Sequence, residues 1–254
     1  MYLSGLIAHL RTLIADEALD FVFQPIFDLH RRDVLGYETL MRGPADSPLH
    51  TPEQLLRVAR DAGLGLVLER LACRRALATF VAAHLPGRLF INLSAAMIVD
   101  QATAAELLEM VKDAGLPPER LVIEHIHHGE DAADGLDAAL RSLVAQGFGL
   151  AFDALGADGT APQPDFVKLA PAHIRQIHSD AHHQQAVAAF VRQAGTLGVQ
   201  VVAEGVEDSR ELATLRALGC DCAQGYLLGR PAADPARQLS RSVAGILLGP
   251  LSPP

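Results

Sequence analysis

Residues 199–207 read Val-Gln-Val-Val-Ala-Glu-Gly-Val-Glu, a short apolar run that ends in the carboxylate of Glu204. The run predicts a buried strand over residues 199–203, and residues 209–218 that follow have the apolar spacing of a helix. A carboxylate at the end of a buried strand is costly unless it meets a cation, a hydrogen-bond donor or water. The segment therefore predicts a strand–helix unit with a polar site at the carboxyl end of its strand.

The same alternation of apolar strands and helical stretches extends along almost the whole chain. The other expected strands are residues 21–27, 34–42, 89–93, 121–126, 149–153, 166–169 and 223–226. The other expected helices are residues 52–62, 67–83, 104–114, 132–146, 185–197 and 235–247. Buried strands that alternate with helices indicate a parallel sheet covered by helices. About eight strands without a linker favour an α/β fold of the TIM-like (β/α)8 barrel type over two doubly wound halves.

The expected domain organisation has three parts: a lead-in helix at residues 1–19, a barrel domain at 20–248 and a short tail at 249–254. The lead-in helix is amphipathic, and both packing on the core and contact with a partner helix fit its pattern. The sequence shows neither the basic start and cleavage site of a signal peptide nor an apolar run of about eighteen residues. We therefore expect no membrane span.

The composition excludes some partners and indicates a location. The formal net charge is −9, with 50% hydrophobic and 20% charged residues, and no basic stripe offers a surface for polymeric nucleic acid. A small phosphodiester ligand remains compatible with this charge, because bound metal ions reverse the local field. Cys73, Cys220 and Cys222 fit neither a disulfide framework nor a usual zinc site, which indicates a reduced, cytoplasmic setting.

Polar residues end, or nearly end, most of the expected strands. Four of them offer hard oxygen ligands of the kind that Mg²⁺ or Mn²⁺ prefers: Glu38, Asn92, Glu124 and Asp153. In a barrel of this class the carboxyl ends of the strands meet on one face, where functional residues lie. These four side chains therefore predict a metal site.

Two further residues extend this site. Glu204 completes a second metal position or holds an attacking water, and Lys168, within an apolar strand, orients a water or a phosphate oxygen. Two metal ions about 4 Å apart would suit in-line displacement at a phosphodiester. Taken singly, each residue also has an ordinary structural interpretation as a surface carboxylate, a helix cap, a turn residue or a lysine that reaches the surface. Their placement at one strand end after another is what indicates a site.

The order of these motifs, over roughly residues 20–235, resembles the EAL family of cyclic-di-GMP phosphodiesterases. The resemblance is carried by Gln-Pro-Ile at 24–26, Tyr-Glu-Thr-Leu at 37–40, Asn-Leu-Ser at 92–94, Glu-Gly-Val-Glu at 204–207 and Gln-Gly-Tyr at 224–226. It implies a barrel of the EAL type in which Glu38, Asn92, Glu124 and Asp153 bind the first Mg²⁺ or Mn²⁺. It further implies catalytic roles for Glu204 and Lys168. Ligand contacts are implied for Gln24, Arg42 and Gln224, and anchoring of a catalytic loop for Glu207.

The sequence departs from the family pattern around one loop. Ala154 stands where the family has a second Asp, and the stretch from Asp153 to Lys168 is about six residues shorter than is usual in the family. His127 replaces a Glu expected three residues after Glu124, and Ala170 replaces an Asp expected after Lys168. These changes weaken the second metal site. They also put the family's usual dimer contact in doubt, because this loop shapes it.

Three hypotheses follow for function. The first is a cyclic-di-GMP-binding domain whose phosphodiesterase activity is weak or lost. The second is an active metal-dependent phosphodiesterase that yields the linear dinucleotide, with Asp158, His127 or His128 as a substitute metal ligand. The third is a protein-interaction scaffold that binds no nucleotide. A homodimer, and a sensor or regulatory partner domain, remain open.

Overall fold

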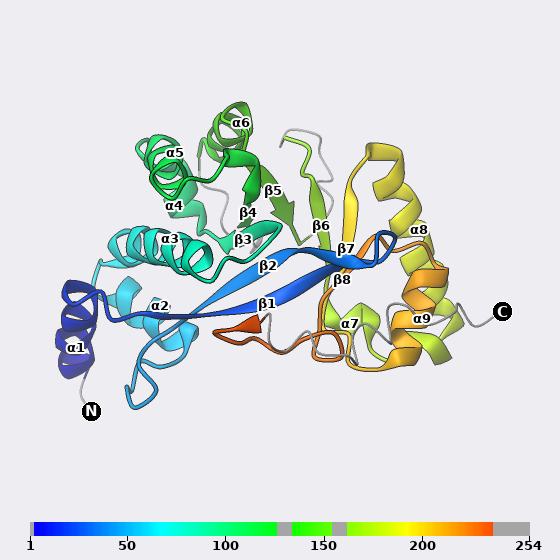
Figure 1. The fold of residues 1–254 in the computed structure, drawn as a ribbon, viewed down its shortest axis with the longest axis horizontal. Helices are drawn as coiled ribbons and strands as arrows, with labels where there is room; N and C mark the ends of the chain where they lie inside the picture. The colour runs from blue at the N-terminus through cyan, green and yellow to red at the C-terminus, as the bar shows by residue number, and fades with distance from the viewer. Residues whose placement is uncertain (1–2, 126–133, 154–161, 236–254) are drawn as a thin grey trace.

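A computed structural model describes residues 3–125, 134–153 and 162–235 of the chain. Within these segments the strands close into a barrel in chain order, each beside the next and β8 beside β1 (Figure 1). The strands are β1 Asp20–Asp28, β2 Asp33–Arg42, β3 Arg88–Asn92, β4 Leu121–His125, β5 Gly149–Phe152, β6 Phe166–Leu169, β7 Gln200–Ala203 and β8 Cys222–Ala223. The expected closed α/β barrel is confirmed.

Helices cover the outside of this barrel. They are α1 Leu3–Ala15, α2 Pro52–Asp61, α3 Gly65–Ala82, α4 Ala95–Val99, α5 Thr103–Asp113, α6 Leu136–Ala145, α7 Pro171–Ile174, α8 Ala181–Leu197 and α9 Ser209–Ala217, with 3₁₀ turns η1 Pro118–Arg120 and η2 Ile177–Ser179. Helices α3 to α6 lie along β2 to β5, and α7 to α9 lie at the opposite end of the molecule, near β6 to β8 (Figure 1).

One strand runs against the expected parallel sheet. Strand β1 pairs antiparallel with both β2 and β8, whereas the other neighbouring pairs are parallel. The reason is the tight turn between β1 and β2, which leaves no room for the crossover that parallel strands need. Asp28 stabilises this turn, because its Oδ1 accepts the N–H groups of His30 at 2.9 Å and Arg31 at 2.8 Å.

The element boundaries follow the sequence pattern closely, with a few differences. Helix α8 begins at Ala181, earlier than expected, because Asp180 caps it by accepting the N–H groups of His182 and His183. The short helices α4 and α7 have too few residues to show a period and were not expected. The expected helix at residues 235–247 and the start of the one at 132–146 lie outside the described residues.

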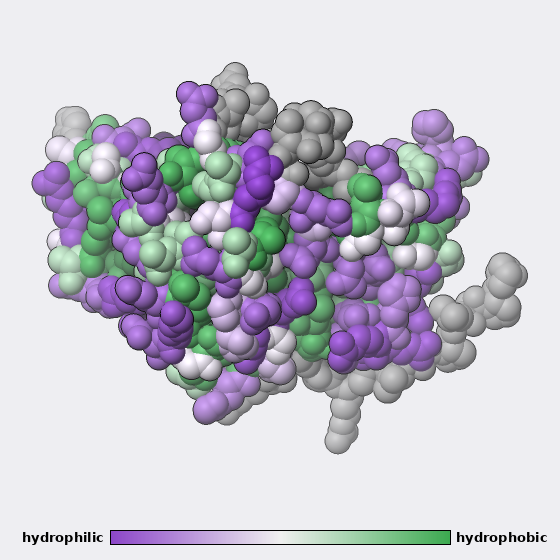
Figure 2. All heavy atoms as spheres, turned by 90° about the horizontal axis from the view of Figure 1, so that it is seen from above, coloured by the Kyte–Doolittle hydropathy of each residue, from purple (hydrophilic) through white to green (hydrophobic). Residues whose placement is uncertain are grey.

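The hydrophobic core has one part inside the barrel and others between the barrel and its helices. Side chains of Ile26, Phe90, Phe166 and Val202 fill the interior. Helix α1 joins the large outer cluster through the buried Leu10 and Leu13, as core packing of the lead-in helix requires. On the face seen from above, hydrophobic side chains are interspersed among hydrophilic ones (Figure 2). None of the helices in the described segments has the length and hydropathy needed to cross a membrane.

Thr39, the residue after Glu38 on β2, gives a stability prediction. Its hydroxyl is buried and has no hydrogen-bond partner among the described residues. An unpaired buried hydroxyl costs about 1–3 kcal/mol, so Thr39→Val is expected to raise the free energy of unfolding by about 1 kcal/mol. Chemical denaturation measures this change in the free energy of unfolding. The matched control is the buried Thr103, whose hydroxyl donates to the Met97 carbonyl, so Thr103→Val is expected to destabilise. Equal destabilisation by both changes would contradict the prediction.

Candidate functional site

Lys168 lies at the centre of a buried carboxylate cluster. On β6 the side chains alternate, so Phe166 and Lys168 face the barrel interior while Val167 and Leu169 pack outward. The Lys168 Nζ atom lies 2.5 Å from Glu124 Oε1, 2.9 Å from Glu204 Oε1 and 3.3 Å from Glu38 Oε2. These carboxylates come from β4, the end of β7 and β2, and the barrel's closure brings them together. The Lys168 side chain is only 2% exposed.

Amide side chains hold Glu38 from the other side. Asn92 Nδ2 donates to Glu38 Oε1 at 3.1 Å, and Gln224 Nε2 donates to Glu38 Oε2 at 2.8 Å. Gln224 Nε2 also lies 3.2 Å from Gln24 Oε1, and Gln24 is the register partner of Glu38 on β1. Asn92 and Glu124 are likewise register partners on β3 and β4. Seven of the residues expected at the site from the sequence, Gln24 among them, therefore form one contiguous cluster with Asp153 nearby.

Asp153 follows β5 directly, and its side chain is exposed at the edge of this cluster. The pKa of Glu204 is raised, chiefly by burial, and the charge of Lys168 opposes this rise. The negative charges of Glu38 and Asp153 add to the rise. Asp153 therefore lies near Glu204. Ala154, His127, His128 and Asp158 lie outside the described residues.

The cluster carries more negative than positive charge. Burial raises the pKa of Glu124 to about 8, the Lys168 charge opposes the rise, and the charges of Glu38 and Glu204 add to it. Burial also opposes ionisation of Glu38, but the Lys168 charge and the donors from Gln224 and Asn92 outweigh it, so the pKa of Glu38 is lowered. Three carboxylates share one ammonium group, and a further cation would be stabilised beside them.

The donor set fits a hard divalent cation. Glu124 Oε2 is buried and has no hydrogen-bond partner among the described residues, which is costly for a carboxylate oxygen unless a cation or a donor meets it. Carboxylate and amide oxygens suit Mg²⁺ or Mn²⁺. In the arrangement seen, the Lys168 ammonium is the cation at the centre. Over the described residues, no group of three or more His, Cys, Asp and Glu side chains is arranged to hold a metal ion.

Two glycines allow close approach of the chain after β7 to its neighbours: Gly205 lies against the chain after β6, and Gly225, after β8, lies against the chain after β7. Gly205 has φ 68°, and a Cβ added there would lie 2.8 Å from Pro171 Cβ. A Cβ at Gly225 would lie 2.2 Å from both the N and the O of Val206. Backbone bonds join the same segments, because Gln224 N donates to Ala203 O at 2.8 Å and Val206 N donates to Gln224 O at 3.0 Å. Glu204 and Gln224 are thereby held at fixed positions relative to each other.

Comparison with known proteins decides the family. The family model described as "EAL domain" matches residues 7–231 of this chain. The chain belongs to the EAL domain family. The resemblance inferred from the motifs is confirmed, and the barrel is of the EAL type.

Relatives of this EAL domain include enzymes of cyclic-di-GMP metabolism. The bifunctional diguanylate cyclase/cyclic di-GMP phosphodiesterase MucR of Pseudomonas aeruginosa is 31% identical over 259 residues, which cover 94% of this chain and 36% of MucR. The cyclic di-GMP phosphodiesterase NbdA of the same organism is 28% identical over 236 residues, covering 88% of this chain and 30% of NbdA. The chain thus spans about a third of the length of the curated relatives it matches.

Among solved structures, the PaMucR phosphodiesterase in complex with c-di-GMP matches this chain with a TM-score of 0.76 and 27% identity. The match covers 93% of this chain and 100% of the PaMucR chain. EAL domains also occur with metal ions bound. Klebsiella pneumoniae BlrP1 has been solved as a manganese/cy-diGMP complex, with a TM-score of 0.74 and 28% identity. That match covers 85% of this chain and 56% of the BlrP1 chain.

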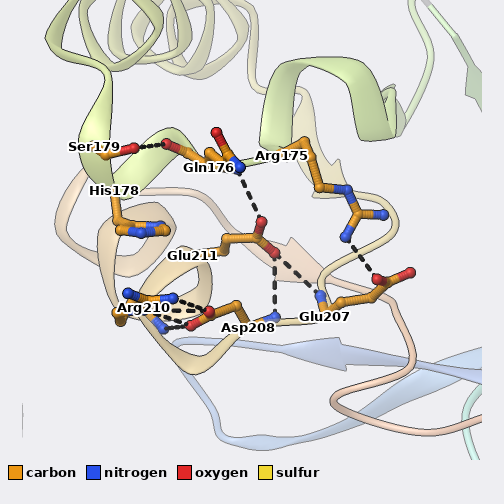
Figure 3. Close-up of a pocket in the computed structure, with 8 residues that line it drawn as sticks. All are labelled: Arg175, Gln176, His178, Ser179, Glu207, Asp208, Arg210 and Glu211. Atoms are coloured by element: carbon orange, nitrogen blue, oxygen red, sulfur yellow. Dashed lines mark hydrogen bonds and ion pairs between the residues drawn. The ribbon is translucent and has the colours of Figure 1, made fainter.

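Two residues expected at the site lie outside the contacts of the cluster. Arg42 follows Glu38 by four residues on β2, and its Nη1 donates to the Met41 carbonyl at 2.8 Å. Glu207, expected to anchor the catalytic loop, is exposed and accepts from Arg175 Nη1 at 2.7 Å (Figure 3). The roles assigned to both residues stay predictions.

Sequence patterns missed one carboxylate that supports the site of this EAL domain. Glu69 on α3 accepts from the backbone N of Ser94 at 2.9 Å and from its hydroxyl at 2.7 Å. Ser94 caps α4 and comes two residues after Asn92, so Glu69 fixes the chain just past the end of β3. A Glu on an amphipathic helix looks like any surface carboxylate in the sequence. Nothing in the sequence signals this contact.

Proposed function

We propose that this EAL domain binds cyclic-di-GMP and that its hydrolysis of this dinucleotide is weak or lost. Binding is supported by the relatives named for cyclic-di-GMP phosphodiesterase activity and by the c-di-GMP complexes of similar structures. The observation that carries the proposal is the convergence of Glu38, Glu124 and Glu204 on Lys168 with Gln224 beside them. Gln24 and Arg42 complete the proposed ligand contacts.

The proposed loss of hydrolysis rests on the sequence around the second metal position. Ala154 stands in place of a carboxylate that would share a second cation with Asp153 and Glu204. A divalent ion with fewer carboxylates around it has less charge compensation, and its occupancy falls. Ala170 and His127 remove two further acidic residues of the family pattern.

The residues of this chain have distinct roles in the proposed site. Glu38, Asn92, Glu124 and Asp153 would hold one Mg²⁺ or Mn²⁺, which, when bound, polarises a phosphoryl oxygen and lowers the pKa of a coordinated water. The Lys168 ammonium donates to a phosphate or water oxygen, and the Glu204 carboxylate accepts from the water. Gln224 donates from Nε2 to Glu38 and has a buried Oε1 without a partner among the described residues, an acceptor for an N–H of the ligand.

Calorimetric titration with cyclic-di-GMP tests the proposal in three buffers, containing Mg²⁺, Mn²⁺ or EDTA. Each mixture is then separated on a column to look for linear dinucleotide. Binding without product, even in excess Mn²⁺, supports the proposal. Steady conversion overturns the loss of hydrolysis and directs attention to Asp158, His127 and His128 as ligands. Absence of binding in every buffer overturns the proposal and leaves a protein-interaction scaffold.

An active phosphodiesterase is the second candidate, because Lys168 and three carboxylates all lie within hydrogen-bond or ion-pair distance. Under either candidate, Glu38→Ala is expected to weaken metal-dependent cyclic-di-GMP binding about 100-fold, since it removes a proposed metal ligand and the acceptor of Asn92 and Gln224. Calorimetry in Mn²⁺ measures this loss, and any turnover falls with it. The exposed Glu109 on α5 supplies the control, Glu109→Ala, which leaves affinity unchanged. Unaltered affinity in Glu38→Ala would place the ligand elsewhere.

The setting of the domain is also part of the proposal. The three cysteines are free and buried, as expected for a reduced cytoplasm. The relatives are much longer than this chain, so a sensor or regulatory domain is the proposed partner, with a homodimer as the alternative.

A further inference from the structure

A second polar cluster lies between the segments that follow β6 and β7. It surrounds a cavity of about 590 Å³ and includes Arg175, Glu207 and Glu211 (Figure 3). Most of its side chains are exposed, but Glu211, on α9, is only 2% exposed. A buried carboxylate outside the proposed ligand site calls for a structural reason, because desolvating its charge is costly.

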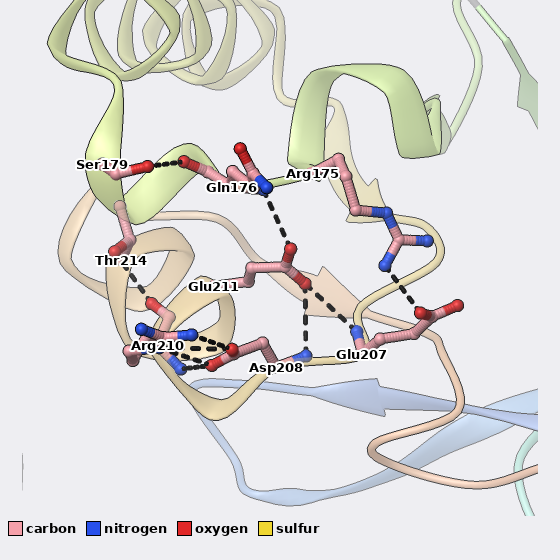
Figure 4. A network of polar contacts seen from close by, with 8 residues as sticks. All are labelled: Arg175, Gln176, Ser179, Glu207, Asp208, Arg210, Glu211 and Thr214. Carbon is pink, nitrogen blue, oxygen red and sulfur yellow. Dashed lines mark hydrogen bonds and ion pairs between the residues drawn. The ribbon is translucent and has the colours of Figure 1, made fainter.

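Glu211 binds the backbone of two different segments. Its Oε2 accepts the N–H groups of Glu207 and Asp208, both at 3.2 Å, and its Oε1 accepts the N–H of Gln176 at 3.0 Å (Figure 4). The Oε2 bonds complete the capping box at the start of α9, in which Asp208 is the N-cap. The Oε1 bond has no part in capping, because Gln176 belongs to the segment after β6.

Gln176 has a backbone conformation that needs support. Its φ is 57°, in the left-handed region that residues other than glycine seldom occupy. The N–H of Gln176 reaches Glu211 in this conformation. Glu211 therefore couples a strained turn after β6 to the loop that begins at Glu204 after β7.

These two segments carry the residues that meet in the proposed site. Lys168 lies on β6, and Glu204 comes directly after β7. Near the strands, Gly205 packs against Pro171, and farther out Glu211 joins Glu207 and Asp208 to Gln176. We propose that Glu211 is a positioning residue, which holds the loop after β7 against the segment after β6 so that Glu204 meets Lys168. The importance of this contact for ligand binding rests on the proposed function.

Glu211→Gln separates this role from helix capping. The amide oxygen of glutamine can take the place of Oε2 and keep both capping bonds. The amide N–H₂ then faces the Gln176 N–H, and two donors cannot bond to each other. The bridge is lost while the cap of α9 remains, so the melting temperature is expected to stay within about 3 °C of the wild-type value. Cyclic-di-GMP affinity in Mn²⁺ is expected to fall about tenfold.

A matched control comes from the other capping box. Gln54 holds the equivalent position on α2, where its Oε1 accepts the Thr51 N–H at 3.3 Å. Gln54→Ala removes a capping contact far along the chain from Glu204, and it is expected to lower the melting temperature by a few degrees without changing affinity. Equal affinity in Glu211→Gln and wild type would overturn the positioning role.

Two further measurements keep the test decisive. A crystal structure of Glu211→Gln is expected to show Glu204 beyond hydrogen-bond distance of Lys168 Nζ. Retention of the 2.9 Å contact between Glu204 Oε1 and Lys168 Nζ would overturn the proposal, whether or not the wild type binds the dinucleotide. Failure of the wild type to bind would refute the proposed function alone. Should Glu211→Gln not fold, the double variant with Gln176→Gly is used, because glycine adopts the left-handed turn without strain. The distance from Glu204 to Lys168 Nζ and the cyclic-di-GMP affinity of the double variant then test the proposal.

Discussion

Replacing Lys168 by methionine is expected to lower the free energy of unfolding by about 3–5 kcal/mol at pH 8 in buffer with EDTA, because breaking a buried ion pair leaves its partners uncompensated. Three carboxylates lie within 3.3 Å of the Lys168 ammonium, and the side chains of Glu124 and Glu38 are only 4% and 13% exposed. Denaturant unfolding measures the loss. Added Mn²⁺ is expected to recover part of it, since a divalent cation replaces the missing charge among the same oxygens.

The pH dependence of this variant follows from Glu124. Burial raises the pKa of Glu124 from 4.5 to about 8, against the opposing charge of Lys168. Because the folded protein binds the proton of Glu124 more tightly than the unfolded chain does, protonation of Glu124 stabilises the fold. This contribution is complete below the unfolded pKa of 4.5 and is lost as the pH rises through the folded pKa of about 8. Removing Lys168 takes away the opposing charge, so the deficit of Lys168→Met is expected to be larger at pH 8 than at pH 5.

The chain offers a matched control for this experiment. Its only other lysine is Lys112, which is exposed on α5. Lys112→Met is expected to leave stability unchanged at both pH values and to show no specific response to Mn²⁺. Equal stability of the two variants at pH 8 in EDTA would show that the carboxylates do not depend on Lys168.

Gly225→Ala is expected to destabilise the protein by about 3 kcal/mol, because its Cβ would overlap backbone that has little freedom to move. The added atom would lie 2.2 Å from the N and the O of Val206, in the segment between Glu204 and Glu207. Thermal unfolding measures the stability, and cyclic-di-GMP titration is expected to show weaker binding, since Gln224 is displaced with the chain.

Gly195 provides the comparison for this change. It lies within α8, and a Cβ there would meet nothing within 4 Å. Gly195→Ala is therefore expected to raise stability by about 0.5–1 kcal/mol, through the better helix propensity of alanine. A tolerated Gly225→Ala would mean that the segments after β7 and β8 separate more easily than their packing implies.

Much of the fold was predictable because its signals are local. Apolar runs such as Phe166–Leu169 and Gln200–Ala203 mark strands, and the helical spacing that follows Asp208 marks α9. The direction of β1 is a different matter. A parallel sheet was the natural expectation from the alternating pattern, and the turn held by Asp28 made β1 antiparallel instead.

The candidate site was predictable in membership but not in geometry. Strand-end polar residues suggested Glu38, Asn92, Glu124 and Glu204, and the structure brings all of them to one cluster. The central position of Lys168 could not be predicted, because it depends on strands β2, β4, β6 and β7 facing one another across a closed barrel. The separate contact of Glu207 with Arg175 was equally hidden, since it depends on where two loops meet.

The sequence by itself determined the strands, the longer helices, the barrel class and the acidic strand ends, because each of these follows from short stretches of hydrophobic periodicity and residue type. Only the tertiary structure decided that one ammonium group lies among three carboxylates and that Glu211 joins two loops. Such contacts arise between residues far apart in the chain. Their energies depend on burial and on distances of a few ångströms, which no local pattern encodes.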